Sequence, residues 1–64
     1  MKVNGIHVDL NENQSLYDYL ISRGYDITII AVEHNGDIVS KSKYKDVLLK
    51  EEDTIEIVSF VGGG

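Results

Sequence analysis

The sequence contains no cysteine, no proline and no tryptophan. Without cysteine, neither a disulfide framework nor a thiolate zinc site can form, and nothing argues for an oxidising compartment. No apolar run approaches the ~20 residues that a membrane span requires. The first residues also lack the basic region and apolar stretch of a secretion signal. We therefore expect a soluble, cytoplasmic protein with no membrane partner.

Basic residues are scarce, since six lysines and arginines stand against eleven aspartates and glutamates, for a formal charge of −5. The only basic cluster is a loose one, Lys41, Lys43 and Lys45, so nucleic acid is not an expected partner. An acidic surface suits rapid docking onto a basic partner protein, because complementary fields raise association rates. Acidic balance also serves solubility alone. Both interpretations remain open.

The sequence also offers no pair of residues arranged as nucleophile and base. Ser15 is interpreted as a helix cap, and the other serines have no arranged partner. His7 and His34 lie in or beside predicted strands, and a metal site would need more ligands than this spacing provides. The acidic residues are expected to form a solvated surface, and the four tyrosines to serve packing. We expect no metal site, no bound cofactor and no enzymatic activity of the chain by itself.

Two Asn-Gly dipeptides predict two β-hairpins, because this dipeptide favours the positive φ of tight hairpin turns. Asn4-Gly5 joins short alternating runs at residues 2–3 and 6–10. Asn35-Gly36 joins the β-branched run that begins at Ile29 to residues 37–39. Four apolar residues are expected to support the first hairpin: Val3, Ile6, Val8 and Leu10.

A short amphipathic helix is predicted between the hairpins. Ser15 can cap its start, Asp18 lies near its positive end, and Gly24 is a natural stop. Four apolar residues at helical spacing are expected to face a sheet: Leu16, Tyr17, Leu20 and Ile21.

A polar loop at 41–50 and a charged turn at 51–53 lead to a final strand at 54–61. The order is ββαββ, a turn region and β, which fits one mixed sheet packed on one helix. With the last strand parallel to the first and beside it, this is the β-grasp arrangement of the α+β class. We expect residues 1–61 to form a single β-grasp domain and residues 62–64 a flexible glycine tail.

The final strand predicts a contact surface next to the tail. Alternation directs Ile55 and Ile57 toward the core. Glu56, Val58 and Phe60 then lie on the solvent side of the sheet. Apolar residues that cluster outside usually mark a contact surface, so Val58 and Phe60 are predicted to bind a partner. Alternatively, they merely cover the sheet or pack on the preceding polar loop.

The closing Gly62-Gly63-Gly64 is narrow enough to thread a tunnel that any β-carbon would block. We expect Gly62 and Gly63 to bind a partner and the terminal carboxylate of Gly64 to react. A carboxylate is a poor acyl electrophile, so it needs activation, for example by attack on the α-phosphate of ATP to give an acyl adenylate. Sulfur could then displace AMP. The alternative is an engineered or frayed glycine end.

Five segments together match one known family: Val3-Asn4-Gly5, the helix at 16–20, and residues 31–39, 53–58 and 61–64. With them the chain resembles, essentially from end to end, the ThiS family, the ubiquitin-like sulfur carrier proteins of thiamine (thiazole) biosynthesis. Its departures touch turns and packing rather than the tail. They are Ser40-Lys41 where Pro-Arg is frequent, Tyr44 where Trp is common, Glu52 where Gly is frequent, and His34 where an aliphatic residue is usual.

The resemblance implies that an E1-like adenylating enzyme (ThiF type) uses ATP and magnesium to adenylate Gly64. It further implies that a sulfur donor system converts the terminus to a thiocarboxylate, and that a thiazole synthase (ThiG type) accepts the sulfur. The carrier is expected to be a monomer when alone. Three alternatives share the features noted so far: the small subunit of molybdopterin synthase, a ubiquitin-like modifier of lysines, and an interaction module or designed β-grasp protein with an incidental tail.

Overall fold

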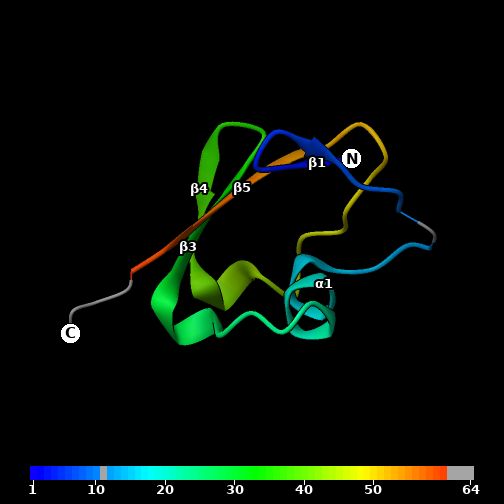
Figure 1. The fold of residues 1–64 in the computed structure, drawn as a ribbon. Coiled ribbons are helices and arrows are strands. Elements are labelled where there is room, and N and C mark those ends of the chain that lie inside the picture. The colour runs from blue at the N-terminus through cyan, green and yellow to red at the C-terminus, as the bar shows by residue number, and fades with distance from the viewer. Residues whose placement is uncertain (11, 61–64) are drawn as a thin grey trace.

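The computed structural model describes residues 1–10 and 12–60, and all structural statements below concern these residues. They contain five strands, one α-helix and two 3-10 helices, in the order β1 (Lys2–Val3), β2 (Ile6–His7), α1 (Leu16–Ser22), η1 (Ile27–Ile29), β3 (Ile30–His34), β4 (Asp37–Val39), η2 (Lys41–Lys43) and β5 (Thr54–Ser59). All five strands join one mixed sheet in the order β2-β1-β5-β3-β4. The predicted α+β β-grasp architecture is confirmed (Figure 1).

Both Asn-Gly dipeptides form the predicted hairpin turns. Asn4 and Asn35 each have a φ of 52°, and the glycines that follow them have φ values of 83° and 92°. β1 pairs antiparallel with β2, and β3 pairs antiparallel with β4. A residue with a β-carbon rarely adopts positive φ, but asparagine tolerates it because its side-chain amide can form hydrogen bonds locally.

The second strand is shorter than the predicted 6–10, because the chain leaves the sheet after His7. The last backbone contact in this region joins the Val8 amide to the Met1 carbonyl at 2.8 Å. Val8 and Leu10 then pack at the margin of the core. Ile6, one of the four apolar residues of the first hairpin, lies on an edge strand and remains 69% exposed.

β5 is the central strand, parallel to β1 and antiparallel to β3. Its pairing with β1 is extended by the Asn4 side chain. The Asn4 Oδ1 accepts a 2.7 Å hydrogen bond from the Ile57 amide, and its Nδ2 donates to the Ile57 carbonyl at 3.2 Å. The strand ends at Ser59, two residues before the predicted end at residue 61. Residue 61 itself lies outside the described residues. Its end lies on the side of the molecule away from the N-terminus (Figure 1).

Helix α1 begins as predicted, with the Ser15 Oγ accepting a 3.0 Å hydrogen bond from the Asp18 amide. It buries Leu16, Tyr19 and Leu20, whereas Ile21 is 49% exposed and Tyr17 only half-buried. The prediction that Ile21 faces the sheet is therefore wrong. Residues at i, i+3 and i+4 define the buried stripe of this short helix, and that spacing selects Tyr19 instead.

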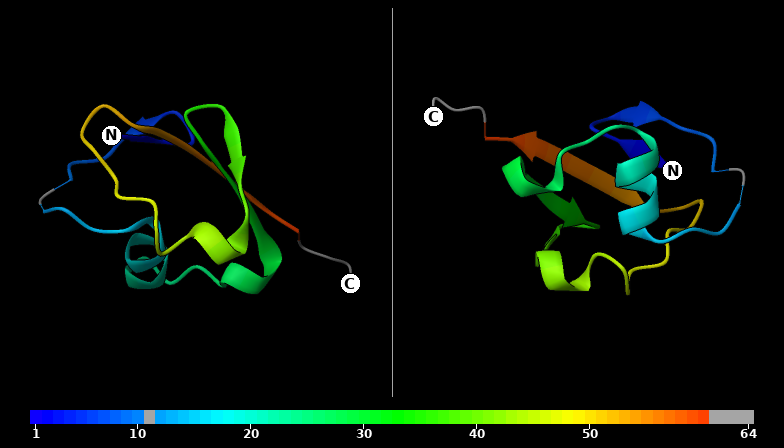
Figure 2. Two further views of the ribbon diagram at one scale, coloured as in Figure 1. Left: turned by 180° about the vertical axis from the view of Figure 1, so that it is seen from behind. Right: turned by 90° about the horizontal axis from the view of Figure 1, so that it is seen from below.

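The helices all lie on one face of the sheet (Figure 2). Between them and the sheet lies a single core of Met1, Val3, Leu16, Tyr19, Leu20, Ile30, Val32, Tyr44, Leu49, Ile55 and Ile57. The opposite face of the sheet is covered by no described helix; this surface is called the outer face below. None of the helices within the described ranges has the length and apolar character needed to cross a membrane.

Candidate functional site

The end of β5 places the two predicted partner-binding side chains in solvent. Ile55 is fully buried and Ile57 is 8% exposed, whereas Val58 and Phe60 are each 59% exposed. The predicted division of the strand between core and solvent is thus confirmed. The exposure of Val58 and Phe60 also contradicts the alternative that the 41–50 loop packs on them.

Phe60 is exposed through its side chain but held through its backbone. Its amide donates a hydrogen bond of 2.6 Å to the Ile29 carbonyl, one step beyond the last strand pair, Ile30 with Ser59. The chain is therefore anchored to the body up to the residue at which the description ends. Gly62, Gly63 and Gly64, predicted to bind a partner and to react, lie outside the described residues.

Strand register defines what else occupies the outer face. Val58 lies opposite Ala31, and Glu56 lies opposite Glu33. Glu33 in turn lies opposite Ile38, which is 78% exposed. The outer face therefore contains exposed apolar side chains from two strands, with two glutamates between them.

A different group of polar residues, at the other end of β5, was not predicted to interact. Asp53 is only 5% exposed, so the prediction that the acidic residues form a solvated surface is wrong at this position. Its Oδ2 lies 2.9 Å from both the His34 Nε2 and the Lys50 amide nitrogen, and its Oδ1 accepts from the Asn35 Nδ2 at 3.0 Å. Burial by itself would raise the pKa of Asp53, but the hydrogen bonds from His34, Asn35 and Lys50 outweigh it and lower that pKa.

This network is structural. The Asn35 Oδ1 accepts from the Thr54 amide at 2.8 Å, and the Asn35 amide donates to the Thr54 carbonyl at 2.8 Å. Each carboxylate oxygen of Asp53 accepts at least one hydrogen bond and the residue is buried, so a substrate has little access to it. His34, which departs from the family pattern, fixes the β3–β4 turn to the start of β5.

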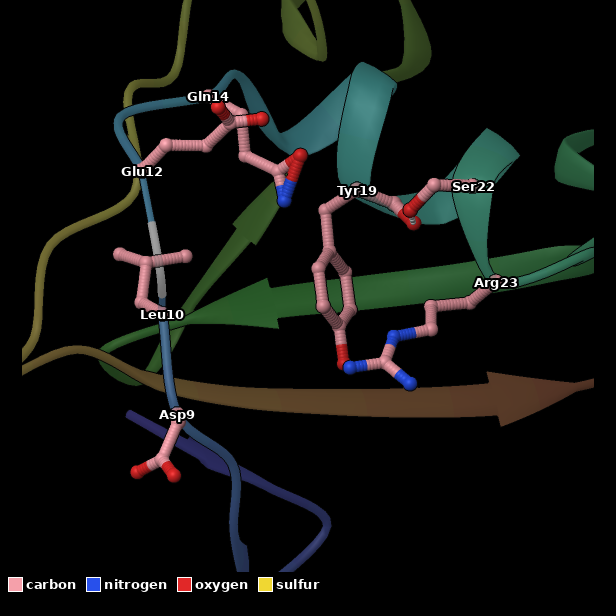
Figure 3. Close-up of a pocket in the computed structure, with 7 residues that line it drawn as sticks. All are labelled: Asp9, Leu10, Glu12, Gln14, Tyr19, Ser22 and Arg23. Carbon is pink, nitrogen blue, oxygen red and sulfur yellow. Dashed lines mark hydrogen bonds between the residues drawn. The ribbon is translucent and has the colours of Figure 1, made fainter.

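A hollow of about 280 Å³ lies between α1 and the segment that precedes it. Its lining consists of Asp9, Leu10, Glu12, Gln14, Tyr19, Ser22 and Arg23 (Figure 3). Figure 3 shows Asp9 and Glu12 well apart, with Leu10 between them, while the Arg23 guanidinium lies 5.3 Å from the centre of the Tyr19 ring. No cluster of metal-ligating side chains occurs among the described residues. The acids do not converge in this hollow, so it is not the candidate site.

Comparison with known proteins identifies the chain. The model of the ThiS family matches residues 1–64. The sulfur carrier protein ThiS of Bacillus subtilis is 38% identical over 65 residues, covering 100% of this chain and 98% of the relative. The thiazole synthase of Paramagnetospirillum magneticum is 37% identical over 62 residues, which span 97% of this chain but 19% of the synthase.

A solved structure agrees with these sequence matches. The crystal structure of the thiamine biosynthesis protein ThiS from Geobacter metallireducens superposes with a TM-score of 0.78 at 27% identity, covering 98% of this chain and 96% of the other. Sequence and fold thus match ThiS proteins over essentially their whole length. The chain belongs to the ThiS family.

Proposed function

We propose that this protein is a sulfur carrier of thiamine biosynthesis and that the terminal carboxylate of Gly64 is its reacting group. The observation that carries the proposal is the full-length match to the ThiS family, whose Bacillus relative is named a sulfur carrier protein. The closing Gly62-Gly63-Gly64 supports it, because three residues without side chains can enter a narrow partner site.

The chemistry is performed on the chain by partner enzymes. In the first step, an oxygen of the Gly64 carboxylate attacks the α-phosphate of magnesium-bound ATP on an E1-like adenylating enzyme, and pyrophosphate leaves. In the second, a sulfide ion supplied by the sulfur donor system attacks the acyl carbon and AMP leaves, so the terminus becomes a thiocarboxylate. The chain itself supplies only the terminus and a docking surface, and acts as a co-substrate that binds no cofactor of its own.

The sulfur acceptor is a thiazole synthase. Two relatives that bear this name, from Paramagnetospirillum magneticum and Magnetococcus marinus, each contain a segment similar to the present chain over 19% of their length. A carrier-like segment inside a synthase chain supports a close working relation between the two activities. Val58 and Phe60, exposed at the strand end that leads into the tail, contribute to the docking surface for such partners.

A reconstitution tests this proposal. Wild-type protein, a variant lacking Gly64, and a variant with one alanine appended after Gly64 are supplied with the adenylating enzyme, ATP, magnesium, a sulfide source, and the thiazole synthase of the same organism together with the substrates that provide the carbon and nitrogen atoms of the ring. We expect thiazole formation with the wild type alone and equal melting temperatures for all three. Undiminished thiazole formation by either variant, or isopeptide adducts in place of sulfur transfer, would contradict the proposal.

A further inference from the structure

Two glutamates face each other across neighbouring strands of the outer face. The register places Glu33 of β3 opposite Glu56 of β5, and both side chains are exposed. Side chains in such a cross-strand pair have Cβ atoms roughly 5 Å apart, and like charges there destabilise the sheet. The free protein therefore bears an energetic cost at this position.

Nothing in the described part of the chain offsets that cost by ion pairing. The ion pairs found there join the N-terminus to Glu51, His7 to Asp9, and His34 to Asp53. Lys2, the cation that the register brings nearest on this face, lies opposite Thr54 rather than Glu56. The two carboxylates thus remain available to a cation from outside the molecule.

The surroundings of the pair are apolar. Ile38, beside Glu33, is 78% exposed, and Val58, two positions along β5 from Glu56, is 59% exposed. Phe60 extends the same side of the strand toward the tail, also at 59% exposure. Apolar side chains of this size in contact with a partner would exclude water from the carboxylates and so strengthen a charge interaction there.

We propose that the outer face docks onto the thiazole synthase and that Glu33 and Glu56 together receive one arginine of that enzyme. The proposal rests on the proposed carrier function. An arginine is favoured over a lysine because its planar guanidinium presents five donors and can bond two carboxylates at once. The occupant is thus a largely apolar protein surface with one arginine near its centre.

This arrangement predicts opposite effects on binding and stability. Replacing both glutamates by glutamine removes the charges that hold the arginine, so affinity for the synthase falls and its salt dependence weakens. The same change relieves repulsion in the free carrier, so its stability does not fall. A merely structural role for the pair would lower stability instead.

The test compares the double variant Glu33→Gln/Glu56→Gln with a control that loses two exposed charges elsewhere, Glu12→Gln/Glu52→Gln. Binding of each unmodified carrier to the thiazole synthase of the same organism is measured by calorimetry at low and moderate salt, and melting temperature by circular dichroism. We expect a loss of affinity of roughly tenfold or more for the outer-face variant, with an equal or higher melting temperature. The control should lose less than about threefold.

Equal affinities of the two double variants would overturn the inference, and so would a fall in the melting temperature of the outer-face variant alone. Because binding is measured on unmodified carrier, this result is separate from the reconstitution above. A wild-type carrier that transfers sulfur while the outer-face variant binds unchanged would refute the arginine contact and leave the carrier function standing.

Discussion

The two ends of β5 contrast sharply. Just before the strand, Asp53 is buried and bonded to three donors, and Thr54 exchanges two hydrogen bonds with Asn35. At the other end, Val58 and Phe60 leave most of their side-chain surface in water. One strand thus joins a region in which the buried polar groups are hydrogen-bonded to a region in which apolar side chains are exposed to water.

The contrast separates stability from function along a single strand. The first end contributes hydrogen bonds that a folded chain of this size needs, because a small core provides little reserve. The side chains of Val58 and Phe60 at the second end contribute little to the fold, since exposed side chains bury little area. This end is therefore free to serve a partner. Substitutions at the two ends should affect different measurements.

The largest effect on stability is expected from Asp53→Ala. It leaves the His34 ring, the Asn35 side-chain amide and the Lys50 backbone amide without their buried partner, which costs about 3 kcal/mol of unfolding free energy. The measurement is urea unfolding followed by circular dichroism, with Asp46→Ala on the exposed loop as the control. A loss for Asp53→Ala no larger than that of the control would show that the network is not what holds this end.

A smaller effect is expected at the middle of the strand from Asn4→Ala. The variant loses both side-chain hydrogen bonds to the Ile57 backbone and places alanine at a φ of 52°, for a combined cost of about 2 kcal/mol. Asn4→Gly removes the bonds but tolerates the positive φ, so it should cost about 1 kcal/mol less. Equal unfolding free energies for the two variants would contradict this division.

Acid should weaken the hydrogen-bond network at the first end of β5. The lowered pKa of Asp53 means that its carboxylate stabilises the fold fully above the ordinary aspartate value of about 4, and that this contribution is lost as pH falls through the lower folded pKa. Hydrogen bonds from the Thr28 side chain and backbone lower the pKa of Asp26 in the same direction. Unfolding free energy should thus fall less steeply with acid in Asp53→Asn than in the wild type. Parallel pH profiles would contradict the assignment.

The smallest effect on stability is expected at the other end, from Val58→Ser/Phe60→Ser. Both side chains are largely exposed, so the unfolding free energy should change by less than about 1 kcal/mol. Affinity for the thiazole synthase should nevertheless fall roughly tenfold or more, as is usual for apolar anchors of an interface. Leu48→Ser, at a 62% exposed position away from this strand, is the control. Unchanged binding, with loss of stability, would contradict the proposal that this end of β5 serves partner binding rather than stability.

Local patterns explain why most of the fold could be predicted from the sequence. Each Asn-Gly dipeptide specifies its own turn, and alternation within β5 is enough to assign Ile55 and Ile57 to the core and Val58 and Phe60 to solvent. The closing glycines predict a reacting terminus by their own lack of side chains, whereas the partner enzymes and the pathway come from the family resemblance.

What could not be predicted depends on contacts between distant segments. The partners of Asp53 include His34 and Asn35, which lie 19 and 18 positions away, so nothing local indicates its burial. The juxtaposition of Glu33 and Glu56 depends on the strand register, which the sequence does not state. The exchange of Ile21 for Tyr19 reflects how α1 is rotated on the sheet, which its two-turn periodicity leaves undetermined.

The central claim is that Gly64 is the sulfur-carrying terminus, and intact mass spectrometry of the protein tests it most directly. The wild type is incubated with the adenylating enzyme of the same organism, ATP, magnesium and a sulfide source, and is then fragmented. We predict a mass gain equal to the difference between sulfur and oxygen, confined to the C-terminal fragment and absent without ATP. An unchanged mass with an adenylating enzyme that demonstrably consumes ATP on this carrier, or a gain located elsewhere in the chain, would contradict the claim.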